Sequence, residues 1–138
     1  MLADKYWSIK PEWSSLKPGE AERINGIESL VAIGDKTFEL VKHYEYVYDL
    51  AEEWIKFTSL PFVFAAWVST KKLPDDILGS FNKALEYGIS HKPETIEFFK
   101  DSIPSGIDAE KYLNENISFE FDSPKKEGLA LFLRLLAE

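Results

Sequence analysis

The sequence predicts an α/β fold, with a largely parallel sheet and a helical C-terminal tail. Short apolar segments alternate with helical patterns through the middle of the chain. Residues 58–69 (TSLPFVFAAWVS) carry no charge, although 29% of the 138 residues are charged. The hydrophobic content of 45% is enough to build a core in a chain of this size. We therefore expect residues 1–138 to form a single α/β unit.

The predicted strands are residues 29–33, 44–48, 62–68 and 117–121. Residues 29–33 form a continuous apolar run, which is typical of a strand buried on both faces. Residues 62–68 (FVFAAWV) have the length and side chains of a strand, again covered on both faces, and Pro61 is tolerated at a strand start. Residues 117–121 alternate apolar and polar side chains and predict a half-exposed strand.

Helical patterns separate and follow these segments. Asp35 is expected to cap a helix over residues 36–43, and Asp49 a helix over 50–58. Further helices are predicted near residues 20–25, over 75–89, from Pro93, near Asp108 and over 124–137, where proline again stands at the start. The last helices form the C-terminal tail.

Composition excludes several classes of function. There is no cysteine, so a disulfide framework and a thiolate metal site are excluded. The net charge of −8 and the lack of a basic stripe argue against a nucleic-acid partner. No apolar run is long enough to span a membrane, and no secretion signal is evident. We expect a cytoplasmic protein without a metal site.

Few residues suggest catalysis. His43 and His91 are the only histidines, and both are expected on the surface. Glu52 and Glu53 are neighbours on a helix, where adjacent side chains point apart, so both are expected in solvent. No nucleophile elbow, phosphate loop or dinucleotide fingerprint is present.

Two places are candidate binding sites. Gly34 and Asp35 follow a predicted strand and precede a helix, where ligands collect in open α/β sheets. The alternative is an ordinary strand-to-helix turn. Pro61 and Phe62 stand at the entry of the uncharged segment, and the alternative there is plain core.

Three stretches resemble a known family in order and spacing. They are AIGDKTFEL, YDLAEEWIKFTSLPFVFAAWVS and KYLNENISFEFDSPKKEGLALFLRLL. They are similar to the chorismate dehydratases of menaquinone biosynthesis, which serve the futalosine route. The resemblance runs from about residue 27 to the end and is weaker upstream.

The resemblance implies a two-lobed fold like that of type II periplasmic binding proteins, with the ligand in the cleft between the lobes. The chain would correspond to the second lobe and the C-terminal part of the first. The implied reaction converts chorismate to 3-enolpyruvylbenzoate and water, without metal or organic cofactor. Gly34 and Asp35 would then lie at the rim of the cleft, and Pro61 and Phe62 would touch it.

Family members are about twice as long, and their N-terminal half holds loops that bind the substrate carboxylates. The chain is therefore expected to be a piece of a longer enzyme or a shortened relative, and no catalytic residue is assigned. Two other functions stay open. One is a non-catalytic module that binds a small carboxylate, and the other is a domain that associates with itself through open strand edges.

Overall fold

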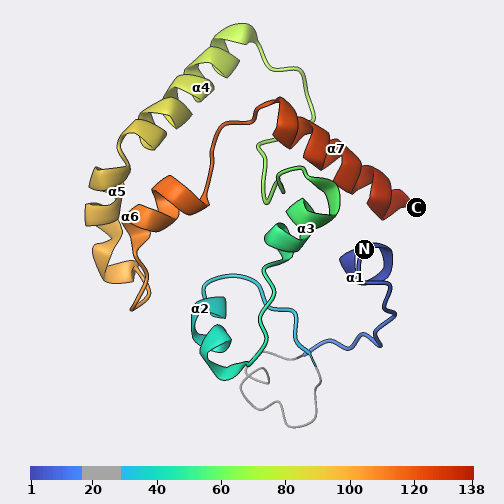
Figure 1. Ribbon diagram of the computed structural model, residues 1–138. Coiled ribbons are helices and arrows are strands. Elements are labelled where there is room, and N and C mark those ends of the chain that lie inside the picture. Colours follow the sequence, from blue (N-terminus) through green and yellow to red (C-terminus); the bar gives the residue numbers. More distant parts are fainter. Residues whose placement is uncertain (17–28) are drawn as a thin grey trace. The chain divides into compact units, whose positions relative to one another are not determined.

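The computed structural model describes residues 1–16 and 29–138 (Figure 1). The helix predicted near residues 20–25 lies outside these described residues. The chain divides into two compact units. Unit 1 contains Met1–Val63 together with Asp122–Glu138, and unit 2 contains Phe64–Phe121.

Unit 1 contains four α-helices and a short 3₁₀ helix among its described residues. These are α1 (Leu2–Lys5), α2 (Thr37–Leu40), the 3₁₀ helix η2 (Val41–His43), α3 (Leu50–Thr58) and α7 (Ser123–Ala137). The predicted helices over residues 36–43, 50–58 and 124–137 are confirmed, with shifts of one residue at some ends.

Unit 2 is also helical. It contains α4 (Asp75–Ser90), α5 (Lys92–Phe99), the 3₁₀ helix η3 (Lys100–Ser102), α6 (Ala109–Lys111) and the π-helix η4 (Tyr112–Asn116). The helix predicted over residues 75–89 and the one predicted from Pro93 are confirmed.

Side-chain caps explain several helix starts. The carboxylate of Asp49 accepts hydrogen bonds from the backbone N–H groups of Ala51 and Glu52 at 2.7 and 3.3 Å. Asp108 accepts in the same way from Lys111 at 2.9 Å. These bonds satisfy N–H groups that have no partner inside the helix. Asp35 does not act as predicted, because the N-cap of α2 is Lys36 and no side chain caps it.

The predicted α/β fold with a parallel sheet is wrong, since the described residues form no strand and no sheet. The expected two-lobed binding-protein fold depends on such sheets, so this expectation is wrong as well. The backbone is nevertheless extended at places inside the predicted strands. Tyr44 has φ −120° and ψ 136°, and Ile117 has φ −118° and ψ 132°. A strand also requires a neighbour to complete its hydrogen-bond ladder, and these segments form none in the described structure.

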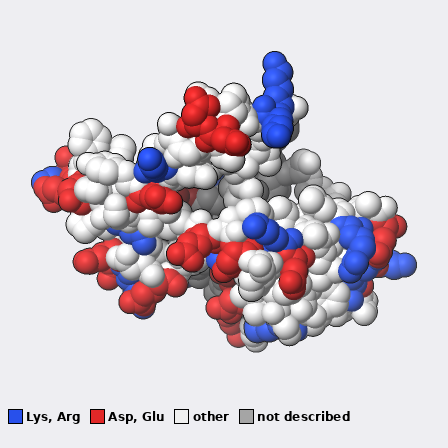
Figure 2. Space-filling model, turned by 90° about the horizontal axis from the view of Figure 1, so that it is seen from above, with Lys and Arg blue, Asp and Glu red and all other residues white. Residues whose placement is uncertain are grey.

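The expectation of strands buried on both faces is also wrong. Ile33 is 83% exposed, and Val68 is 89% exposed. Among the described residues Trp54 is the one large side chain that is fully buried. Figure 2 shows wide uncharged areas between acidic and basic side chains. Much apolar surface therefore faces solvent.

No helix in the described part of the chain is both long enough and apolar enough to cross a membrane.

Candidate functional site

The core of unit 1 forms around Trp54 on α3. Its ring meets the rings of Phe57, Phe62 and Phe132 edge to face, with centroid distances of 6.4, 6.0 and 5.7 Å. Phe62 and Phe132 meet in turn at 5.2 Å. Edge-to-face contacts of this kind add stability beyond the burial of area. We call these four residues the Trp54 cluster.

Phe62, a predicted site residue, thus lies against the core of unit 1. The indole N–H of Trp54 is buried and has no hydrogen-bond partner in the described structure. A buried donor without an acceptor costs free energy. The Trp54 cluster is therefore an apolar wall with one unsatisfied polar group.

Pro61, the neighbouring site residue, lies directly against α7. Gly128 of α7 is buried, and a Cβ atom at this position would overlap the carbonyl oxygen of Pro61. Only glycine allows the helix to approach the backbone so closely. Gly128 therefore brings the segment at Pro61 and Phe62 against α7, where Phe132 contacts Phe62.

Gly34 and Asp35 form an exposed turn before α2. Gly34 has φ +82°, a left-handed conformation that favours glycine. Its carbonyl oxygen accepts hydrogen bonds from the backbone N–H and the hydroxyl of Thr37, at 2.9 and 2.8 Å. The carbonyl of Asp35 accepts from the N–H of Phe38 at 3.1 Å.

The four predicted site residues thus fall into two pairs with different surroundings. Gly34 and Asp35 make these hydrogen bonds within their own turn. Pro61 and Phe62 lie on the Trp54 cluster and α7. That the two pairs border one crevice stays a prediction.

Glu53 is a buried carboxylate next to the Trp54 cluster, and only 6% of it is exposed. The Lys56 ammonium donates to Oε1 at 2.6 Å, and the Trp7 indole N–H donates to Oε2 at 3.2 Å. The hydrogen bond from Lys56 is the main cause that lowers the pKa of Glu53, and burial opposes it. Both oxygens thus have donors, and the carboxylate is held in its charged form.

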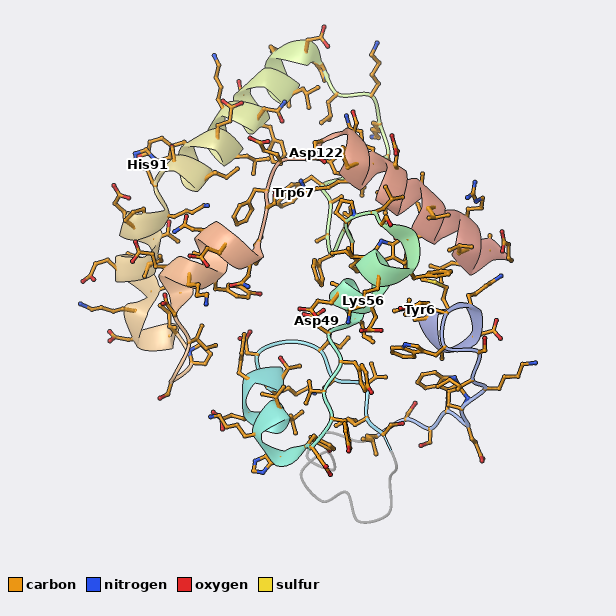
Figure 3. The ribbon with its side chains drawn as sticks, viewed as in Figure 1. Tyr6, Asp49, Lys56, Trp67, His91 and Asp122 are labelled. Atoms are coloured by element: carbon orange, nitrogen blue, oxygen red, sulfur yellow. The ribbon has the colours of Figure 1, made fainter. Side chains whose placement is uncertain are left out.

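The expectation that Glu52 and Glu53 both face solvent is right for Glu52 and wrong for Glu53. The signal that could have found Glu53 is the spacing of three residues to Lys56, which places the two side chains on one helix face. Its link to Trp7 joins residues far apart in sequence. Figure 3 labels Lys56 on α3 and Tyr6 beside α1, and the Tyr6 ring contacts the Phe57 ring at 5.2 Å.

His43 is exposed, as predicted, and His91 is half-buried between α4 and α5. The imidazole of His91 stacks on Tyr87 with a centroid distance of 3.8 Å. Its Nδ1 lies 2.7 Å from the carbonyl oxygen of Tyr87 and 3.0 Å from the hydroxyl of Ser90. These contacts fix the His91 ring at the junction of α4 and α5, so its role is structural.

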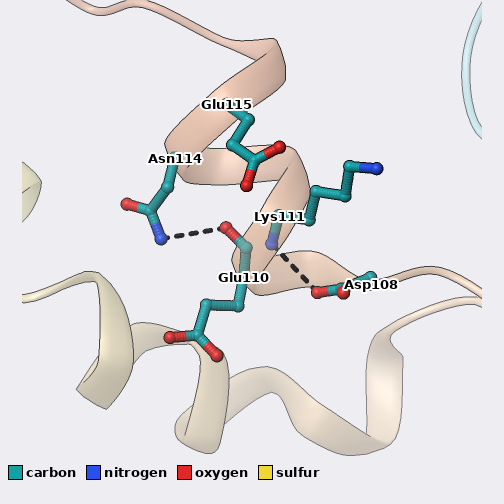
Figure 4. Close-up of a pocket in the computed structure, with 5 residues that line it drawn as sticks. All are labelled: Asp108, Glu110, Lys111, Asn114 and Glu115. Carbon is teal, nitrogen blue, oxygen red and sulfur yellow. Dashed lines mark hydrogen bonds between the residues drawn. The ribbon is translucent and has the colours of Figure 1, made fainter.

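A hollow of about 350 Å³ lies on α6 and η4 (Figure 4). It is lined by Asp108, Glu110, Lys111, Asn114 and Glu115. Three carboxylates and one ammonium make it net negative, so it is poorly suited to an anionic ligand. Asn114 donates to the carbonyl of Glu110 at 2.9 Å, so part of its polar surface is already engaged.

No group of three or more acidic, histidine or cysteine side chains in the described ranges is arranged to hold a metal ion. The described site is an apolar wall beside an ion pair in which Glu53 is buried and Lys56 is exposed.

Comparison with known proteins defines the class of the chain. A family model described as menaquinone biosynthesis matches residues 1–138. The chain therefore belongs to the menaquinone biosynthesis family, and its role lies in that pathway. The family resemblance found in the sequence is confirmed over the whole chain. No solved structure matches the chain.

Proposed function

We propose that the chain contributes to the dehydration of chorismate to 3-enolpyruvylbenzoate and water. The family match over residues 1–138 is the observation that carries this proposal. The step is a β-elimination, in which a proton leaves one carbon and hydroxide leaves its neighbour. The two fragments together are the water that is released, so the step needs no oxidant or reductant.

The residues proposed to meet the substrate are Gly34, Asp35, Pro61 and Phe62. The Gly34 turn is exposed, with open space where a side chain would stand. Its backbone N–H groups are suitable partners for a carboxylate, since a close approach is possible only without a Cβ atom. Phe62 offers the edge of an apolar wall to the ring of the substrate.

A second candidate function is binding of a small carboxylate without turnover. The hydrogen bond between Lys56 and Glu53 is the main cause that lowers the pKa of Glu53 and raises the pKa of Lys56. A general acid or base works best with a pKa near the operating pH. Because Glu53 and Lys56 both stay charged at neutral pH, neither has the pKa of a general acid or base. This supports a binding role for this part of the protein.

One experiment separates the two functions. Chorismate is added to the purified chain, its ring-diene absorbance is followed, and binding is measured by calorimetry on the same sample. Loss of absorbance with formation of 3-enolpyruvylbenzoate supports the dehydratase. Heat of binding without product supports the carboxylate module, and the absence of both contradicts both functions.

A matched pair of glycine variants tests the proposed site. Gly34 and Gly106 have φ of +82° and +87°, and both have open space at the Cβ position. Alanine at either position introduces similar backbone strain, roughly 1 kcal/mol. Gly34→Ala is expected to weaken chorismate binding about tenfold, which corresponds to about 1.4 kcal/mol, whereas Gly106→Ala leaves binding unchanged. Equal effects of the two variants would remove Gly34 from the site.

A further inference from the structure

Residues 1–9, which we call the N-terminal strap, lie against α3 within unit 1. The indole N–H of Trp7 donates to Oε2 of Glu53 at 3.2 Å. The Tyr6 ring contacts the Phe57 ring with a centroid distance of 5.2 Å. One polar and one aromatic contact therefore hold two adjacent residues of the strap on the same helix.

Two carboxylates fasten the strap to unit 1. Glu53 of α3 accepts from Trp7, and Glu138, at the C-terminal end of α7, accepts from the Lys5 ammonium at 2.8 Å. The pair of Lys5 and Glu138 is exposed, and exposed ion pairs contribute little to stability. The buried carboxylate of Glu53 is therefore the main anchor of the strap.

The helix inside the strap depends on these contacts. α1 has four residues, and none of them is buried. Isolated helices shorter than ~12–15 residues are only marginally stable in water. Because α1 is too short to persist alone, loss of the anchors would melt it.

The backbone of the strap is strained at Ser8. Ser8 closes the turn after α1 with φ 55°, and the N–H of Ile9 donates to the carbonyl of Ala3 at 2.7 Å. The Cβ atom of serine disfavours this left-handed conformation, which persists only where surrounding contacts hold it. Detachment of the strap relaxes Ser8, so the backbone favours release and the side-chain contacts oppose it.

Protonation weakens both carboxylate anchors, because a hydrogen bond to a charged group is roughly twice as strong as one to a neutral group. The titratable groups that act at these anchors are Lys56, Glu52 and Tyr6 around Glu53, and Lys5, Arg134 and Asp4 around Glu138. Hydrogen bonds from Lys56 and Lys5 are the main causes that lower the pKa of Glu53 and of Glu138 below the ordinary 4.5. Both anchors are therefore complete above pH 4.5 and are lost as the pH falls through the lowered pKa values.

We propose that the N-terminal strap is released by acid: when Glu53 and Glu138 take up protons, it detaches from α3 and melts while the Trp54 cluster stays folded. The cluster can persist because its rings belong to α3, α7 and Phe62, and none belongs to the strap. Release uncovers the carboxyl group of Glu53 and the ring of Phe57. This change is independent of the reaction that the protein supports.

Glutamine at the two anchors imitates protonation at neutral pH. We compare the double variant Glu53→Gln, Glu138→Gln with the control Glu52→Gln, Glu127→Gln, which removes the same charge at two exposed side chains. The full chain carries fluorotryptophan at its four tryptophans, and fluorine NMR with a solvent-isotope shift measures the exposure of each ring. Trp7→Phe assigns the signal of Trp7, and Trp54→Phe assigns that of Trp54.

The open fraction of the strap at pH 7 is expected to be at least tenfold higher in the anchor variant than in the unmodified chain. The Trp7 signal then shows an exposed ring, while the Trp54 signal still shows a buried one. The control variant is expected to keep Trp7 in place. An unchanged Trp7 signal in the anchor variant, exposure of Trp54 together with Trp7, or an equal effect of the control would each overturn the proposal.

Acid titration of the unmodified chain gives a second test. Trp7 is expected to become exposed with a midpoint below pH 4.5, before Trp54 does. Ser8→Gly relieves the strain and is expected to lower the ratio of open to closed strap about fivefold at this midpoint. Ser59→Gly relieves similar strain at φ 59°, at the end of α3, and is expected to leave the ratio unchanged. Simultaneous exposure of Trp7 and Trp54, or equal effects of the two glycine variants, would contradict a separately released strap.

Discussion

Gly128→Ala tests whether α7 lies against the carbonyl of Pro61. In an open helix interior, alanine stabilises relative to glycine by about 1 kcal/mol. At Gly128 the added Cβ atom would overlap a backbone oxygen, and one of the two segments has to move. Overpacking of this kind costs about 1–3 kcal/mol, and a rigid backbone neighbour places it at the upper end. We therefore expect the free energy of unfolding to fall by about 2 kcal/mol.

Gly79→Ala is the matched control, because Gly79 also lies inside a helix but has no atom within 4 Å of the Cβ position. This variant is expected to gain about 0.5–1 kcal/mol, so the two substitutions have opposite signs. Urea unfolding followed by circular dichroism measures both. If Gly128→Ala raises the midpoint as Gly79→Ala does, α7 does not contact Pro61 in this way.

Trp54→Ala is expected to cost about 3–5 kcal/mol in urea unfolding because it empties the Trp54 cluster, whereas Trp13→Ala, at a 69% exposed side chain, changes little. Equal effects would refute the assigned core. The lowered pKa of Glu53 contributes stability at neutral pH, and this is lost as the pH falls below its ordinary value of 4.5. Melting temperatures at pH 7 and 4 should therefore differ less in Glu53→Gln than in the unmodified chain. Glu52→Gln should keep the full difference, and an unchanged difference in Glu53→Gln would refute the role of the ion pair.

The sequence was a good guide to the helices because their signals are local. Asp49 caps α3 as expected, and apolar residues at helical spacing mark α3, α4 and α7. Each of these patterns acts over a few residues. The helices therefore follow from the sequence without knowledge of their neighbours.

The strands failed because a strand needs a partner that no local pattern supplies. The backbone at Tyr44 and Ile117 is extended, as the composition indicates, yet no ladder forms among the described residues. Hydrophobicity also failed as a measure of burial, since Ile33 is 83% exposed. Burial depends on what covers a segment, and this is a property of distant parts of the chain.

The candidate site, too, was predictable from the sequence only in part. The family was predictable from three sequence motifs. The positions of Pro61 and Phe62 against the core agree with the alternative of plain packing. The spacing to Lys56 indicates one partner of Glu53, but its second partner, Trp7, is distant in sequence. A long-range hydrogen bond of this kind is invisible to a pattern read over one helix.

Unit 1 is assembled from two stretches of chain that are separated by the whole of unit 2. Lys5 and Glu138 join these stretches by an ion pair at 2.8 Å, and Phe132 completes the Trp54 cluster from the second stretch. During translation, the ribosome must therefore make all of unit 2 before α7 exists to close unit 1. Until then the indole of Trp54 lacks its contact with Phe132. The nascent chain therefore exposes apolar surface of the kind that chaperones bind.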